Sequence, residues 1–150
     1  MLAQMLAPAA VLVLWTLFMV AWVAVTRFSA FKNVGLDLSA APPGGRYQER
    51  EDQMPDKVNW KSHNHTHLME QPTVFYPTVI ILAMTGAGSW DVLLAWVYVS
   101  LRVAHSLWQS LVNTIPVRFA LFFVSTFVLI ALAIRAVMAT VFADPSLAPQ

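Results

Sequence analysis

Five ionisable side chains lie inside apolar stretches of this chain, where a charge is costly. They are Glu70, Arg102, His105, Arg118 and Arg135. A charged group in the middle of a membrane-spanning helix costs about 2.5–3.5 kcal/mol on insertion scales, so each of these residues is a candidate for function. The surrounding stretches place the first four at a similar depth. Arg135 lies apart, near the far end of its stretch, with Asp144 as a candidate partner.

Three polar side chains share one face of the helix expected around them. Arg102, His105 and Gln109 are spaced i, i+3 and i+7. Facing Glu70 and Arg118, they would form a polar pocket with apolar walls. Because guanidinium groups bind carboxylates through a planar fork and a carboxylate can hold an ammonium group, this pocket suits an anionic ligand that also carries an amine. The alternatives are an ion pair between Glu70 and Arg102 that only fixes helix packing, and an interfacial anchor at Arg118.

A second pattern of possible ligands precedes the first of these residues. His63, His67 and Glu70 are spaced i, i+4 and i+7, so on a helix they would share one face, from which His65 points away. Two histidines and one carboxylate form a known type of metal site. The alternative is a polar interfacial segment without metal.

The composition decides which kind of protein carries these residues. Hydrophobic residues make up 58% of the 150 and charged residues 11%, with a mean hydropathy of +0.61. Soluble domains carry roughly 25% charged residues, so a soluble globular enzyme is excluded. A net charge of +1 provides no field that would attract nucleic acid. The absence of cysteine excludes disulfides, thiolate metal sites and a cysteine nucleophile.

The apolar runs predict an all-α integral membrane protein with one domain over residues 1–150. Four segments are long enough to span a hydrocarbon layer of about 30 Å: residues 6–27, 66–86, 90–113 and 116–142. The first lacks the positive start of a cleaved signal peptide, which favours a permanent helix. A polar loop is expected over about residues 29–61.

The distribution of lysine and arginine predicts the orientation. Six of these residues lie in or beside the first loop: Arg27, Lys32, Arg46, Arg50, Lys57 and Lys61. The N-terminal tail and the 86–91 turn have none. Since positive loops stay in the cytoplasm, we expect the long loop to be cytoplasmic and both termini to lie outside.

Three stretches together resemble the MAPEG family, the membrane-associated proteins in eicosanoid and glutathione metabolism. They are HLMEQPTVFY at 67–76, LRVAHS at 101–106 and RF at 118–119. The resemblance covers roughly residues 15–141 and points to bacterial members, which implies a bacterial inner membrane. It also implies a left-handed bundle of four helices that assembles as a homotrimer.

The resemblance further implies glutathione as cofactor, bound between neighbouring subunits in the cytoplasmic half. Arg118 matches the arginine that lies near the glutathione sulfur in enzymatic members, which gives it the catalytic place. The binding residues that the resemblance implies are Arg27, His67, Glu70, Arg102, His105 and Gln109.

The sequence also departs from the family pattern at three positions. His67 stands where asparagine is usual, Thr66 where the eicosanoid enzymes often have arginine, and Gln109 where tyrosine is expected. The leading hypothesis is a membrane glutathione transferase-like enzyme that conjugates or reduces a lipophilic electrophile. The departures favour a second hypothesis, a non-catalytic lipid-binding or scaffold protein of the same fold. A third is a membrane metalloenzyme that uses His63, His67 and Glu70.

Overall fold

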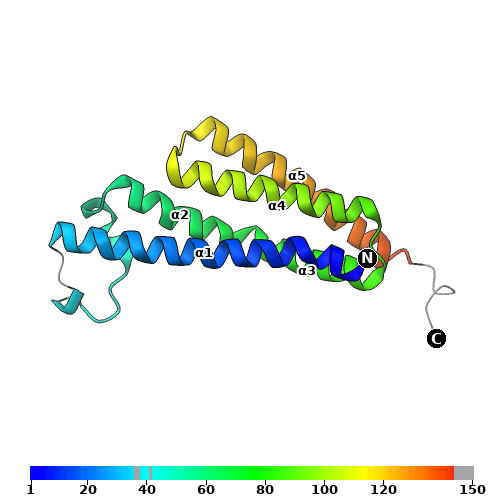
Figure 1. The fold of residues 1–150 in the computed structure, drawn as a ribbon, viewed down its shortest axis with the longest axis horizontal. Helices are drawn as coiled ribbons and strands as arrows, with labels where there is room; N and C mark the ends of the chain where they lie inside the picture. The colour runs from blue at the N-terminus through cyan, green and yellow to red at the C-terminus, as the bar shows by residue number, and fades with distance from the viewer. Residues whose placement is uncertain (36–37, 41, 144–150) are drawn as a thin grey trace.

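The computed structural model of this protein describes residues 1–35, 38–40 and 42–143, and over these residues it is all-α (Figure 1). The α-helices are α1 (Leu2–Val34), α2 (Asp56–Glu70), α3 (Pro72–Thr85), α4 (Ser89–Leu111) and α5 (Ile115–Thr140). Two short 3₁₀ helices, η1 (Leu38–Ala40) and η2 (Tyr47–Gln53), lie between α1 and α2. Since α3 continues the direction of α2, the chain forms four rods packed side by side (Figure 1). The predicted all-α helical bundle is confirmed.

The second rod is divided in two because of a proline. Pro72 has no N–H group, so the carbonyl of Leu68 loses its helical hydrogen bond there. Helix α2 ends at Glu70, and α3 begins with Pro72 in its first turn, where proline is well tolerated. The span predicted at 66–86 therefore consists of parts of two helices, and Glu70 lies at their junction.

A continuous apolar core holds the four rods together. Met5, Leu12 and Met19 of α1 are spaced seven residues apart and are fully buried. They belong to one cluster with Phe75 of α3 and Tyr98 of α4, whose rings stack 4.4 Å apart. The opposite faces of the rods leave large apolar side chains exposed, as expected for surfaces that contact lipid or other subunits.

Two of the described helices, α1 and α5, are long and apolar enough to cross a membrane by length and composition alone. Only 17% of the most apolar window in each is buried inside the chain. The other two rods do not meet this criterion. Helix α3 is short because of the break at Pro72, and α4 carries the polar stripe that contains Arg102.

The loop predicted over 29–61 is shorter in the structure. Helix α1 continues to Val34 before Gly35 ends it in a left-handed conformation (φ 70°), which glycine adopts without strain. Helix α2 already begins at Asp56. Between them, η2 packs against α1, where the ring of Tyr47 meets that of Phe31 at 6.2 Å. We call this end of the bundle the loop end.

Arg135 has a structural role at the opposite end. Its Nε and Nη2 donate to the two carboxylate oxygens of Asp91 at 2.7 and 3.0 Å. Asp91 is 1% exposed and also accepts a hydrogen bond from the Gly88 N–H at the start of α4. This bidentate pair fastens the beginning of α4 to α5. Asp144, the partner considered from the sequence, lies outside the described residues.

Candidate functional site

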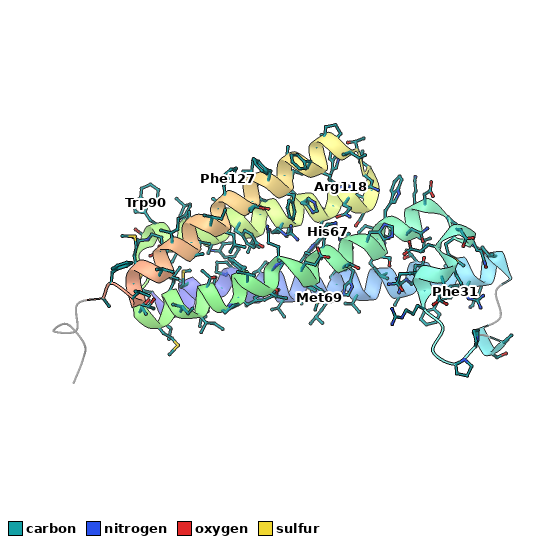
Figure 2. All side chains as sticks on the ribbon, turned by 180° about the vertical axis from the view of Figure 1, so that it is seen from behind. Phe31, His67, Met69, Trp90, Arg118 and Phe127 are labelled. Atoms are coloured by element: carbon teal, nitrogen blue, oxygen red, sulfur yellow. The ribbon has the colours of Figure 1, made fainter. Side chains whose placement is uncertain are left out.

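Three of the predicted site residues line one cavity near the loop end. His67 of α2, His105 of α4 and Arg118 of α5 surround a volume of about 170 Å³. Its remaining walls are apolar and come from Ile115, Phe119 and Phe122 of α5. The two imidazole rings lie 5.9 Å apart, edge to face. Figure 2 shows His67 and Arg118 on neighbouring helices of this region.

The turn between α4 and α5 holds Arg118 in place. Its Nη1 donates to the side-chain oxygen of Asn113 at 2.7 Å. Asn113 has a left-handed backbone (φ 58°), a conformation that asparagine tolerates better than most residues. Beside it, Trp108 Nε1 donates to the hydroxyl of Thr114 at 3.0 Å. The role of Asn113 could not be predicted from its spacing, although Asn-Thr-Ile-Pro is a typical start of a helix after a turn.

Arg102 of α4 is buried next to the site but does not line this cavity. It is fully buried, and its Nη2 donates to the backbone carbonyl of His67 at 2.7 Å. Its Nε and Nη1 have no partner within the described chain, and the guanidinium faces the ring of Phe122 at 5.7 Å. Buried polar atoms without partners are costly, so an additional acceptor in this region would be favourable.

Glu70 faces outward and does not pair with Arg102. Its side chain is 60% exposed, and its Oε2 lies 3.3 Å from Nδ1 of His67 on the same helix. The interhelical ion pair considered from the sequence is thus absent from the described residues. Gln109 is buried and its side-chain oxygen has no partner there. Like Arg102, it does not line the cavity.

Arg27 of α1 lies closer to the loop end, beside Ser62 of α2, and lines a different cavity. Its Nη2 donates to the hydroxyl of Ser62, and its guanidinium stacks 3.7 Å above the ring of Tyr47. A third cavity, of about 280 Å³, lies between the two and is lined by Gln48, Glu51, Ser62, His63, Thr66 and His67. It shares His67 with the first cavity, and the Ser62 that it contains binds Arg27. One polar surface therefore runs along α2 from Arg118 to Arg27.

Comparison with known proteins decides the family. The MAPEG family model matches residues 5–138. The chain belongs to the MAPEG family. No curated protein and no solved structure matches it. The family and the apolar helices make it an integral membrane protein.

The metal site considered from the spacing of His63, His67 and Glu70 does not form in this MAPEG protein. His63 turns toward η2, where its Nε2 lies 3.0 Å from Oε2 of Glu51, while Glu70 turns to His67. In residues 1–35, 38–40 and 42–143, no group of three histidine, cysteine or acidic side chains comes together. The metalloenzyme hypothesis built on His63, His67 and Glu70 is therefore not supported by the geometry.

A buried hydrogen-bond network that the sequence did not reveal lies next to the site in this MAPEG protein. The hydroxyl of Ser106 on α4 accepts hydrogen bonds from Asn64 Nδ2 of α2 at 2.6 Å and from Trp15 Nε1 of α1 at 3.0 Å. Asn64 and Ser106 are fully buried. This network joins α1, α2 and α4 next to His67 and His105, since Asn64 lies one turn before His67 and Ser106 directly follows His105.

Proposed function

We propose that this MAPEG protein is a membrane glutathione transferase-like enzyme that conjugates or reduces a lipophilic electrophile. The observation that carries the proposal is the cavity in which His67, His105 and Arg118 meet beside apolar walls. Such a cavity presents a fixed positive charge and polar ring nitrogens to a small anionic ligand, and an apolar surface to a second, lipophilic molecule.

The donors along α2 fit glutathione. This tripeptide carries two carboxylates and one ammonium group. The polar surface offers the guanidinium groups of Arg27 and Arg118 at its two ends, and the Glu70 carboxylate lies one helical turn beyond His67. An extended tripeptide is about 10 Å long. The helix from Ser62 to His67 rises about 7.5 Å, so the surface has a suitable length. The unpartnered Nδ1 of His105 supplies a further polar atom at the thiol end.

Each residue would then have a defined task. When bound, glutathione supplies the sulfur nucleophile, so no side chain of this protein needs to act as one. The positive charge of Arg118 stabilises the charged form of a thiol beside it, and Asn113 holds the guanidinium in position. Phe119 and Phe122 exclude water from the cavity. Arg102 acts as a positioning residue, because it holds the backbone of His67 from below.

The exposure of Glu70 supports a homotrimer as part of this proposal. Its carboxylate is 60% exposed at the junction of α2 and α3, close to Thr73 and Val74, which begin an exposed apolar face. A carboxylate facing lipid at that level would be costly. A neighbouring subunit that covers this face would remove the cost and complete the walls of the site.

One departure from the family pattern favours the second function, a non-catalytic lipid-binding or scaffold protein. Gln109 replaces the expected tyrosine and is buried away from the cavity, so it offers no contact to a ligand there. This protein therefore has one contact to the ligand fewer than the family pattern provides.

The activity is tested with protein reconstituted into liposomes. Glutathione consumption is followed with an activated aryl halide and, separately, with a lipid hydroperoxide, and protein-free liposomes serve as the control. We expect glutathione-dependent turnover with at least one of the two electrophiles. No turnover with either, together with stoichiometric lipid that co-purifies with the protein, would favour the non-catalytic function.

A further inference from the structure

A larger cavity than that of the site lies at the loop end and shares only Arg27 with the surface assigned to glutathione. Its volume is about 380 Å³, and it is bounded by the last turns of α1 and by η2. Its lining residues are Ala24, Arg27, Phe28, Phe31, Gly45, Arg46, Tyr47 and Arg50. Figure 2 shows Phe31 at this end of the molecule, where the segment between α1 and α2 meets α1. The lining combines three arginines with aromatic and aliphatic side chains.

Because η2 is a 3₁₀ helix, its side chains line two different cavities. Residues three apart lie above one another on a 3₁₀ helix. Tyr47 and Arg50 share one side and line this cavity, whereas Gln48 and Glu51 share another and line the cavity next to His67. Glu51 is also engaged with His63. Glu51 thus lines the cavity next to His67 and not the cavity with the arginines.

Among the described residues, no ion pair neutralises the three arginines of this cavity. The ion pairs of the described residues involve Glu51, Glu70 and Asp91, and none of them reaches Arg27, Arg46 or Arg50. The Nε of Arg27 is buried without a hydrogen-bond partner. Burial raises the pKa of the Tyr47 phenol, so this group stays neutral and adds no negative charge.

The position of the cavity along α1 indicates which kind of ligand could neutralise its positive charge. Arg27 is the first charged side chain of α1, after an uncharged stretch long enough to cross a bilayer. It therefore lies near the level where lipid phosphates begin. Ala24, about one turn toward the bilayer, and the 60% exposed Phe28 beside Arg27 continue the apolar surface of the helix. A ligand here meets positive charge on one side and an apolar helix face on the other.

We propose that this cavity binds the phosphate headgroup of an anionic phospholipid. The arginines of η2 would hold the phosphate, for which their planar donor groups are well suited, while an acyl chain follows Phe28 and Ala24 into the bilayer. Anionic lipids of the inner leaflet attract basic segments that lie next to a spanning helix. A lipid bound here would hold η2 against α1. It would thereby fix the position of Arg27, which forms one end of the polar surface. The site does not depend on glutathione binding.

The test compares two variants that each lose two positive charges. Arg46→Gln/Arg50→Gln removes charges of the cavity, and Lys32→Gln/Lys57→Gln removes two exposed charges that do not line it. Both proteins are purified in detergent and titrated with phosphatidylglycerol or phosphatidylcholine, and bound lipid is counted by native mass spectrometry. We expect the arginine variant to bind phosphatidylglycerol roughly tenfold or more weakly than the wild type. The lysine variant should bind it like the wild type.

Four results would overturn the proposal. Unchanged phosphatidylglycerol binding in the arginine variant would place the lipid elsewhere, and equal loss in the lysine variant would show general charge attraction. Wild-type protein that binds phosphatidylcholine as well as phosphatidylglycerol would show no recognition of anionic lipid. Inorganic phosphate is added as a competitor at millimolar concentration. If it displaces phosphatidylglycerol completely from the wild type, the ligand is a free phosphate and not a lipid headgroup.

Discussion

Arg118 is the residue on which the proposed chemistry depends most. It lines the cavity with His67 and His105, and its charge would stabilise a thiol in its charged form. We expect Arg118→Ala to abolish conjugation while glutathione binding stays mostly intact, because the other contacts along α2 remain. Initial rates and calorimetric binding on the same preparation provide the check. Equal loss of rate and binding would contradict the role given to Arg118.

Asn113 provides a finer test, because its side-chain oxygen accepts a hydrogen bond from the Arg118 guanidinium. Asn113→Gly removes the oxygen that accepts the 2.7 Å hydrogen bond, yet glycine adopts the left-handed backbone of this turn without strain. We therefore expect kcat to fall about tenfold, which corresponds to about 1.4 kcal/mol of lost positioning, with KM for glutathione and the melting temperature nearly unchanged. A lower melting temperature with normal kcat would mean that Asn113 serves only the turn.

At the scale of elements, the pair of Asp91 and Arg135 fastens α4 to α5. Asp91 is 1% exposed, so removing its partner leaves a buried carboxylate without a counter-charge. We expect Arg135→Ala to lower the melting temperature by several degrees. The double variant Asp91→Asn/Arg135→Ala should recover part of that loss, because its buried side chain is neutral. If the double variant is as unstable as the single one, the charge of Asp91 is not the cause.

The boundaries of the helices could be predicted where the sequence contains a strong stop signal. The segments expected at 90–113 and 116–142 lie close to α4 and α5, because Gly88 and Pro116 mark their starts. The sequence has no such signal before Gly35, so α1 is longer than expected. Helix α2 begins earlier than the expected span because its first two turns are polar, and apolar runs do not mark a polar helix.

The residues that belong to the site were easier to predict than the directions in which their side chains point. Spacing on one helix placed Arg102, His105 and Gln109 on a common face, and all three are buried on α4. Only His105 reaches the cavity, because Arg102 is bound to the carbonyl of His67 and Gln109 packs away from the opening. Such differences depend on how α2 packs against α4, which periodicity within one helix does not contain.

At the scale of the whole molecule, the proposal requires more than one subunit. Glu70 is exposed beside an apolar face, and the apolar helices α1 and α5 are mostly uncovered within one chain. We expect the mass of the detergent-purified protein, corrected for bound detergent by light scattering, to equal three chains of 16.7 kDa each. A monomer at concentrations that retain activity would contradict the shared site.

The central claim is that the polar surface of α2 binds glutathione, and calorimetry tests it most directly. Detergent-purified wild type is titrated with glutathione beside Glu70→Ala, which removes the carboxylate next to His67, and the control Glu49→Ala, which removes an exposed carboxylate of η2. We predict saturable binding to the wild type and the control, and its loss in Glu70→Ala. No binding at millimolar glutathione, or equal binding by all three proteins, would contradict the proposed site.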